Sequence, residues 1–516
     1  MRKGPSRSRV AVTLVVLGAL VGGCSSSEYG ATEADPVSFT GLPPEEITPP
    51  PAEGKGVNMP QPAAAAPEGY VTEELFVGGT ATSFEAADTP KDGRWSARPD
   101  DEAGYRTRVI VRRPASPADF SGTVIVEWLN VSALESSPDW AFLSTEIGRE
   151  GHAYIAVSAQ AQGVEGGDTL LDVDVDEEQA EEAGVSADTS GLKNIDANRY
   201  GTLVHPGDAY AYDIFAQVGR AVSESPDQLL GGLEPSRVIA TGESQSAAFL
   251  TTYVNAIHLL DPVFDGFLVH SRFGGAAPID GDYVAARTGE DSDRVVRPGI
   301  QIRTDLDVPV LIFETETDLT VLGYASARQP DTDRVRTWEV AGLSHADAHF
   351  IRAVIGGPRD PGVGDLVGCE EPINVGPQHE VLQAAVHHLA AWVAGGDPPP
   401  AGTPIELTDD EKPTIDRDDL GIALGGVRHP LVDVPTVVLS GDPPGGASRE
   451  DLGVCFLFGS TTPIDQATLL EMHGSADAYV EAFTESAQEA VAAGFLLQPD
   501  ADALVAEAEA NRALFG

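Results

Sequence analysis

Short, continuous apolar runs recur along the chain and constrain its fold more than any other feature. The segment "GTVIVEWLN" (122–130) is rich in β-branched residues, and "AYIAVSAQ" (153–160) repeats the pattern. Runs of this kind are typical of strands that are buried on both faces. Between them, "PDWAFLSTEIGREG" (138–151) has a helical pattern that begins with Pro138 and ends with Gly151. Strands that alternate with helices predict a mostly parallel sheet with helices on both faces.

The same alternation continues toward the C-terminus, and no internal repeat interrupts it. Further strand patterns lie at 105–114, 238–240, 264–271, 308–315 and 334–342, and further helical patterns lie at 205–222, after Ser244 and at 379–396. The chain has 516 residues, of which 42% are hydrophobic, so it can bury a sizeable core. We therefore predict one α/β domain over residues 71–516, with a C-terminal extension.

Two polar stretches interrupt this rhythm, at 163–203 and 272–299. Each follows a predicted strand at what should be its C-terminal end, where the loops of parallel sheets form active sites. Both are candidate cap insertions over a site, and the second is the stronger candidate. The alternative is that both are solvated loops.

The N-terminus has the pattern of an export signal. Four basic residues precede a short apolar stretch (10–20) that is too short to span a membrane, and the small residues after it end in Cys24. This pattern resembles a bacterial lipoprotein signal, which implies removal of residues 1–23 and lipidation of Cys24. An ordinary secretory signal is the alternative. Residues 24–70 are rich in Pro, Ala, Glu and Ser, which predicts a disordered tether to the extracytoplasmic face of the cell membrane.

Composition narrows the classes of partner. The formal net charge of −49 repels nucleic acid and anionic lipid headgroups, so we expect no nucleic-acid partner and membrane contact only through the anchor. If Cys24 carries lipid, Cys369 and Cys455 are left as an even pair in an oxidising compartment, and we predict a disulfide between them. Two buried thiols are the alternative. The sequence contains no CxxC motif and no Cys/His cluster, so we expect neither a metal nor an organic cofactor.

A nucleophile motif follows the strand pattern at 238–240. The residues "GESQS" (242–246) match G-x-S-x-G with serine in the last position. The motif requires small residues two positions either side of the serine, because a strand and a helix approach closely at a strained corner. The match alone is weak, but a buried strand before it and a helix after it are the context that the motif requires. We predict Ser244 as the nucleophile.

An acid and a histidine follow Ser244 along the chain, in the order serine, acid, histidine that accompanies this nucleophile motif. A serine needs a histidine to take its proton, and the histidine needs an acid to hold its tautomer. Asp318 comes just past the strand at 308–315, and His345 comes just past the strand at 334–342. We predict Asp318 as the acid, with Glu316 as the alternative. His345 is chosen because it follows its strand most directly, in a loop that contains glycine. The competing histidines are His349, four residues later, and His205 and His270, near strand or helix ends, whereas His387 and His388 lie in a predicted helix as packing or surface residues.

An oxyanion hole needs two N–H groups aimed at one point. We expect one to be the amide of Gln245, directly after the nucleophile, and the other to come from the loop after the strand at 122–130. Asn130 is the candidate in that loop, with Leu129 and Val131 as neighbours that could replace it.

The chain resembles the α/β-hydrolase superfamily, and within it a bacterial group called alpha/beta hydrolase domain-containing proteins. The resemblance covers roughly residues 70 to 516, and the segments "GESQSAAFLTTYVNAIHLLDPVFDGFLVHSR" (242–272), "ETETD" (314–318) and "ARQPDTDRVRTWEVAGLSHAD" (327–347) carry most of it. It implies serine hydrolase chemistry and supplies no substrate.

These observations together predict an anchored or secreted serine hydrolase. Ser244 would attack an acyl carbonyl, and a small-molecule carboxylic ester is the expected substrate because it asks least of leaving-group protonation. An amidase or peptidase with the same residues is one alternative. A non-catalytic binding lipoprotein on a hydrolase fold is the other. The sequence leaves the acyl and alcohol preference and the oligomeric state open.

Overall fold

The structure is a computed structural model, and it describes residues 41–167, 169–171, 191–281, 283, 299–356, 361–410, 412–442 and 453–516. The predicted signal peptide, Cys24 and the first part of the predicted tether lie outside the described residues. So do the middle parts of both candidate cap insertions, at 172–190 and 284–298.

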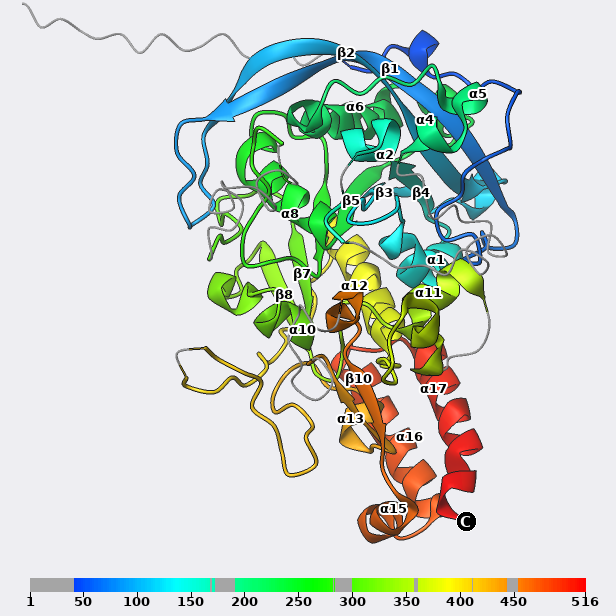
Figure 1. The fold of residues 1–516 in the computed structure, drawn as a ribbon, viewed down its shortest axis with the longest axis vertical. Coiled ribbons are helices and arrows are strands. Elements are labelled where there is room, and N and C mark those ends of the chain that lie inside the picture. The colour runs from blue at the N-terminus through cyan, green and yellow to red at the C-terminus, as the bar shows by residue number, and fades with distance from the viewer. Residues whose placement is uncertain are drawn as a thin grey trace, which may run out of the picture. The chain divides into compact units, whose positions relative to one another are not determined.

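An eight-stranded sheet forms the centre of the domain, in the order β1-β2-β4-β3-β5-β6-β7-β8 (Figure 1). The strands are β1 (Tyr70–Ala86), β2 (Ala97–Pro114), β3 (Thr123–Trp128), β4 (Ala153–Val157), β5 (Arg237–Glu243), β6 (Gly266–His270), β7 (Val310–Thr315) and β8 (Val335–Val340). Neighbouring strands from β4 to β8 are parallel, and β2 pairs antiparallel with both β1 and β4. The predicted fold class is therefore confirmed.

The central strands separate two hydrophobic cores. Every residue of β3 is buried, and its side chains alternate: Val124 and Val126 belong to one core, whereas Ile125 belongs to the other. Successive side chains of a strand point to opposite faces, so a strand covered on both sides is apolar at every position. This is why the strand patterns read as continuous apolar runs.

Helices cover both faces. Residues of α6 (Ala211–Glu224) and α8 (Gln245–Thr252) belong to the first core, and residues of α1 (Pro138–Glu150) and α12 (Gln378–Val393) belong to the second. α1 and α12 also pack on each other. The shorter helices are α2 (Ala161–Glu165), α4 (Leu192–Ile195), α5 (Ala197–Tyr200), α7 (Pro226–Leu229), α10 (Glu316–Thr320), α11 (Ala348–Ile355) and α13 (Pro430–Asp433).

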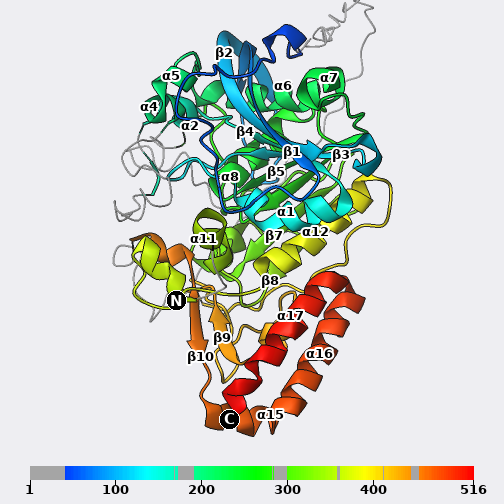
Figure 2. The ribbon, with the colours of Figure 1, turned by 90° about the vertical axis from the view of Figure 1, so that its right-hand side faces the viewer.

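The C-terminal extension adds a small sheet and three helices. β9 (Val437–Ser440) and β10 (Ser460–Pro463) pair antiparallel, and α15 (Gln466–His473), α16 (Ala476–Ala493) and α17 (Gln498–Ala510) follow. α16 and α17 lie side by side (Figure 2), and their apolar residues join the second core. Among the described residues, no helix combines the length and apolarity that crossing a membrane requires.

Much of the predicted tether is in fact packed against the domain. Leu42 and Ile47 are buried in the first core, and Thr48 pairs with Phe76 of β1 through backbone hydrogen bonds of 2.8 and 2.9 Å. Trp140 Nε1 donates to the carbonyl of Ala64 at 2.8 Å. The prediction of a disordered tether up to residue 70 is therefore wrong for residues 41–69. Hydrogen bonds and scattered apolar side chains anchor this segment, so it has no hydrophobic periodicity that the sequence could reveal.

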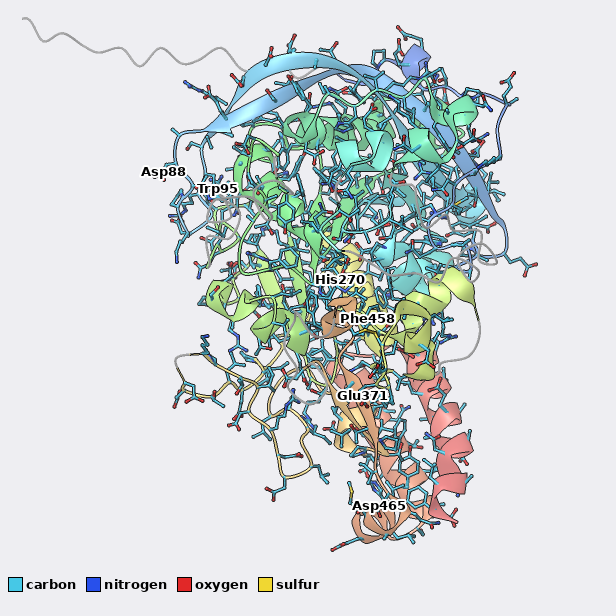
Figure 3. All side chains as sticks on the ribbon, in the orientation of Figure 1. Asp88, Trp95, His270, Glu371, Phe458 and Asp465 are labelled. Atoms are coloured by element: carbon cyan, nitrogen blue, oxygen red, sulfur yellow. A yellow bond between two sulfur atoms is a disulfide. The ribbon has the colours of Figure 1, made fainter. Side chains whose placement is uncertain are left out.

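Cys369 and Cys455 form a disulfide, which confirms the predicted pairing. Their Cα atoms are 5.5 Å apart, and 86 positions separate them in the sequence. The bond lies in a small hydrophobic cluster that also contains Ile351, Ile373 and Phe458, the last of which is labelled in Figure 3. It links the segment after α11 to the segment before β10.

Candidate active site

Ser244 lies at the sharp corner between β5 and α8. Its backbone has φ 59° and ψ −116°, a conformation that residues with a Cβ rarely adopt and that is found where surrounding structure enforces strain. The corner is tight: a Cβ added to Gly242 would lie 3.1 Å from Cβ of Ser246. This close approach explains why small residues occupy both positions and why serine can replace glycine at 246.

The structure brings the three predicted residues together. Ser244 Oγ lies 2.8 Å from Nε2 of His345, and Nδ1 of the same ring lies 2.6 Å from Oδ1 of Asp318. Ser244 is 7% exposed and His345 is 4% exposed, whereas Asp318 is fully buried. With Nδ1–H donated to the carboxylate, Nε2 is left as the proton acceptor for the serine hydroxyl.

Asp318 is fixed by the first turn of α10. Thr315 donates to Oδ2 of Asp318 from both its backbone N–H, at 2.7 Å, and its hydroxyl, at 2.8 Å. The Asp318 amide returns a bond to the Thr315 hydroxyl, which completes a capping box. Because Oδ2 is held in this way, Oδ1 is presented to His345.

Glu316, the alternative acid, faces a different set of groups. Its Oε1 accepts from the Gly342 amide at 2.5 Å, and its Oε2 accepts from the Gly441 amide at 2.9 Å and from Arg417 at 2.7 Å. Gly342 begins the loop that leads to His345. Glu316 therefore supports this loop, and Asp318 is the acid that contacts the imidazole.

Glu243 is a further carboxyl at the site, and the sequence analysis did not single it out. Its Oε1 lies 3.2 Å from His345 Nε2, and its Oε2 accepts from the side-chain amide of Asn130 at 3.0 Å. Burial raises the pKa of Glu243 to about 7, although His345 and His270 act in the opposite direction. The motif treats position 243 as variable, so nothing in the sequence pattern pointed to it.

The prediction of the Asn130 amide as an oxyanion donor is not supported. This amide donates to the Ser136 carbonyl at 3.0 Å, and the neighbouring amides of Leu129 and Val131 donate to Val157 O and to Gln245 Oε1, both at 3.1 Å. A short turn closed by Asn130 and Ser136 occupies the Asn130 amide, and β4 and the Gln245 side chain occupy the other two. Gln245 is the first residue of α8, so helical hydrogen bonding leaves its amide free, as the prediction requires.

The Gln245 side chain is held by the loop that contains Val131. Its Oε1 is engaged by Val131, whereas its Nε2 is buried and has no partner within the described residues. An amide group has two N–H donors on that nitrogen. The residue after the nucleophile therefore carries a buried side-chain donor in addition to its backbone N–H.

His270, at the end of β6, forms a second histidine–carboxylate pair. Its Nδ1 lies 2.8 Å from Oδ1 of Asp139, whose other oxygen accepts from the Thr241 hydroxyl at 2.6 Å. Its Nε2 lies 3.2 Å from Nε2 of Gln378. Both members of the pair are fully buried, and their contacts with Thr241 and Gln378 link β5, β6, α1 and α12; His270 is labelled in Figure 3.

The remaining competing histidines are also held by other partners. Nε2 of His205 contacts the Ala159 carbonyl at 2.8 Å, and burial lowers the pKa of this histidine. His349 stacks on His379 with ring centroids 3.8 Å apart. Nε2 of His388 contacts the Gly494 carbonyl at 2.9 Å. None of these rings is brought to Ser244.

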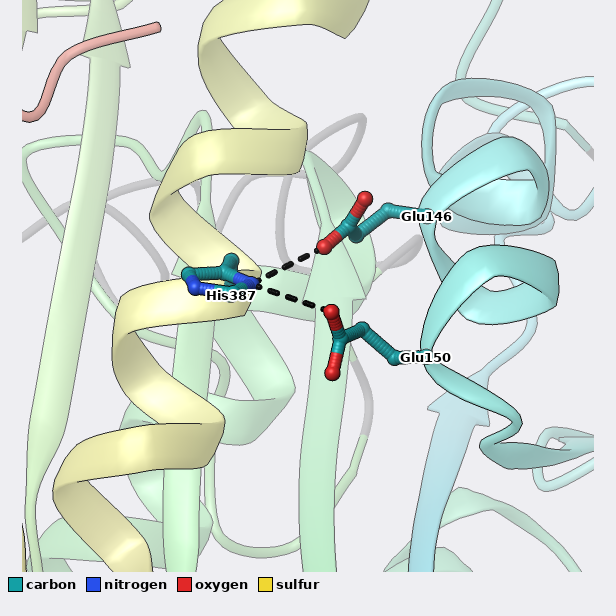
Figure 4. Close-up of side chains that lie close together, drawn as sticks. All are labelled: Glu146, Glu150 and His387. Carbon is teal, nitrogen blue, oxygen red and sulfur yellow. Dashed lines mark hydrogen bonds and ion pairs between the residues drawn. The ribbon is translucent and has the colours of Figure 1, made fainter. Parts of the chain in front are cut away.

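His387 bridges two carboxylates near the surface (Figure 4). Its Nδ1 lies 3.0 Å from Oε1 of Glu146 and 3.5 Å from Oε1 of Glu150. The hydrogen bond that His387 donates to Glu146 raises the pKa of His387, and Arg149 pairs with the second oxygen of Glu146 at 3.0 Å. The side chains of Glu146, Glu150 and His387 lie close enough together to bind one metal ion. Arg149 pairs with Asp500 as well as with Glu146, and the raised pKa of His387 favours its cationic form, so we interpret the cluster as an ion-pair network.

A cavity of about 390 Å³ lies beside β8, lined by residues that include Tyr324, Arg328, Thr337, Glu339 and Pro404. Neither Ser244, Asp318 nor His345 lines this cavity. The hydrogen-bonded residues Ser244, His345 and Asp318, and not this cavity, therefore define the candidate site.

Comparison with curated proteins gave no match. Among solved structures, the chain is similar to fungal esterases from Rhizomucor miehei (12% identity, covering 65% of this chain and 88% of that one, TM-score 0.31). It is also similar to esterase Est22 (14% identity, covering 62% and 81%, TM-score 0.31). A third is acetyl xylan esterase 1 from Thermoanaerobacterium sp. JW/SL YS485 (12% identity, covering 57% and 83%, TM-score 0.27).

These structural likenesses are too distant to carry an argument about activity. The sequence profile described as "Alpha/beta hydrolase domain" gives a result of a different kind, because it matches residues 46–506 and so spans most of the chain. The protein therefore belongs to the alpha/beta hydrolase domain family.

Proposed function

We propose that the protein is a serine hydrolase that cleaves carboxylic esters through an acyl-enzyme. The observation that carries the proposal is the chain of contacts from Ser244 Oγ through His345 to Asp318, at 2.8 and 2.6 Å. A hydroxyl, an imidazole and a carboxylate linked in this order form an activated nucleophile.

In the first half of the reaction, Ser244 Oγ forms a bond to the carbonyl carbon while its proton passes to Nε2 of His345. Asp318 stabilises the resulting imidazolium through Nδ1–H. The same proton then passes to the leaving alcohol oxygen as the ester C–O bond breaks. In the second half, water takes the place of the alcohol, and the acid leaves as Ser244 regains its proton.

The tetrahedral intermediate needs donors for its oxyanion. The backbone N–H of Gln245 is one. The buried Nε2 of the same residue is the candidate for the second, because the amides of Leu129, Asn130 and Val131 are already engaged. In this proposal both donors come from the residue after the nucleophile.

Esters are favoured over amides because an alcohol leaves with less help from proton transfer than an amine does. We further propose that Cys24 anchors the protein by lipid on the extracytoplasmic side of the membrane. The basic and apolar N-terminal pattern and the disulfide, which is typical of oxidising compartments, support this location. Acyl-chain labelling of the native protein, compared with Cys24→Ser, tests the anchor separately from the chemistry.

A fluorophosphonate probe tests the enzyme directly, because it reports an activated serine without knowledge of the substrate. Wild type should label at Ser244, and Ser244→Ala should not label and should lose nearly all turnover. Ser246→Ala is the matched control: the Ser246 hydroxyl is buried and has no partner among the described residues, so labelling should persist. Full labelling of Ser244→Ala would rule out this nucleophile. An unlabelled wild type would favour a non-catalytic binding protein.

Pairs of esters and amides with the same acyl group then separate the two hydrolase classes. Turnover of the esters alone supports the proposal. Equal or faster turnover of the amides would assign the protein to the amidases or peptidases and leave the roles of the three residues unchanged.

A further inference from the structure

Glu243 contacts the nitrogen of His345 that exchanges the proton, which distinguishes it from the other carboxyls of the site. Asp318 binds Nδ1, the far side of the ring, whereas Oε1 of Glu243 lies 3.2 Å from Nε2. We propose that Glu243 is a second catalytic carboxylate, which stabilises the protonated His345 from its reacting side. This inference rests on the proposed function and assigns a further residue to the same reaction.

Asn130 fixes the direction of this carboxyl. Its side-chain amide donates to Oε2 of Glu243 at 3.0 Å and to the Glu243 carbonyl at 3.1 Å, while its own Oδ1 accepts from the Ser132 amide at 2.7 Å. Oε2 and the backbone are therefore held by one anchored side chain. Oε1 is left to face the imidazole.

The charges around Glu243 come from four elements. His345, in the loop after β8, and His270, on β6, favour its ionised form. Asp139, on α1, and Asp318, on α10, oppose it. Burial is the largest influence and raises the pKa to about 7, so the ionisation falls in the range where a histidine also titrates.

The two protonation states of Glu243 have opposite effects on His345. When ionised, Oε1 accepts a hydrogen bond from Nε2–H of the imidazolium, which forms as Ser244 gives up its proton. When neutral, the carboxyl can donate to Nε2 and compete with the serine hydroxyl. The proton itself moves only from Ser244 Oγ to Nε2 and on to the leaving oxygen, and Glu243 forms no covalent bond.

Glu243→Gln tests the charge with little change in shape. The second-order rate constant of fluorophosphonate labelling is measured from about pH 5 to about pH 9, because labelling needs proton transfer to His345 and no known substrate. We expect the plateau rate to fall about tenfold. An anion that stabilises imidazolium also raises its apparent pKa, so the midpoint of the rising limb should move down by about one pH unit in the variant.

Glu316→Gln is the matched control. It neutralises another buried carboxyl that supports the His345 loop without contacting the ring, so its midpoint should stay at the wild-type pH. Asn130→Ala keeps the charge of Glu243 but removes its anchor. The midpoint of its pH profile of labelling should move in the same direction as that of Glu243→Gln, but by a smaller amount.

The outcomes separate this inference from the proposed function. A wild type that does not label at any pH removes the proposed function, and this inference with it. A wild type that labels, beside a Glu243→Gln protein with the same midpoint, overturns the role of Glu243 alone. That holds even if the plateau rate and the thermal midpoint of unfolding fall, because those losses would show only a structural carboxyl.

Discussion

Two histidine–carboxylate pairs lie at the C-terminal ends of β6 and β8, which β7 separates in the sheet, and a serine contacts the histidine of one pair. Nδ1 of His345 lies 2.6 Å from Asp318, and Nδ1 of His270 lies 2.8 Å from Asp139. The pairs differ at Nε2, which meets the Ser244 hydroxyl in the first and the amide of Gln378 in the second. A histidine held by a carboxylate is therefore not a site by itself. The group on its other nitrogen decides what it does.

Backbone geometry produces this difference. The strained corner at Ser244 lifts a hydroxyl to a ring that is slightly exposed, whereas His270 and Asp139 are sealed between helices and strands. The same chemical unit thus serves reactivity in one place and packing in the other. The following predictions test this division, from the largest expected effect to the smallest.

Replacing His345 should lower activity, whereas replacing His270 should lower stability. His345→Ala should lower kcat on an ester by about 10³- to 10⁶-fold with little change in stability, because it removes the general base. His270→Ala should instead lower the free energy of unfolding by about 3 kcal/mol, because Asp139 is left buried without its partner. Steady-state kinetics and urea unfolding of both variants measure this. Equal losses of kcat in fully folded proteins would contradict the division.

Replacing the two acids, Asp318 and Glu316, should lower kcat by very different factors. Asp318→Asn should lower kcat by about 10³- to 10⁴-fold, because an amide favours the wrong tautomer of His345. Glu316→Gln should lower it less than about tenfold, since this side chain acts through the loop at Gly342. Both are assayed on one ester under the same conditions. The reverse ranking would transfer the role of the acid to Glu316.

Thr241→Val probes the sealed pair without touching either of its members. The variant removes the hydroxyl that donates to Asp139 Oδ2 at 2.6 Å and leaves that oxygen without this donor. The free energy of unfolding should fall by about 1 to 2 kcal/mol, while kcat of the folded enzyme stays near the wild-type value. A large loss of kcat would show that the two pairs are coupled.

His387 offers a third pair, one that is partly open to water. Its hydrogen bond to Glu146 raises its pKa above the unfolded value of about 6.5, so the pair stabilises the fold below that pH. This contribution is lost as the pH rises through the raised pKa. The thermal midpoint of wild type should therefore exceed that of His387→Ala at acidic pH, and the gap should narrow at alkaline pH. A gap that does not change with pH would show that packing, not charge, is responsible.

Sequence patterns predicted the parts of the fold that are buried on two faces. β3, β5 and β7 each contain an uninterrupted run of at least three apolar residues, and this leaves a clear signal. β1 was missed because it is an edge strand whose exposed positions are polar and whose centre holds Gly78 and Gly79. The segment 41–69 docks through isolated contacts, which have no period to detect.

The site was predictable where chain order and strand ends define it. Ser244, Asp318 and His345 each follow a strand, so topology alone brings them to one edge of the sheet. The contact between Glu243 and Asn130 was not predictable, because it depends on side-chain directions at a strained corner and on how a short turn closes. Local geometry of this kind leaves no spacing pattern.

The conformation of Ser244 also has a consequence for evolution in the laboratory. A backbone with φ 59° and ψ −116° suits glycine, and a residue with a Cβ there costs about 1 to 3 kcal/mol. A library of variants selected only for resistance to heat should therefore accumulate glycine at this position and become inert. Selection for durability and selection for turnover oppose each other at a single codon, so any stabilisation campaign on this protein needs an activity screen in every round.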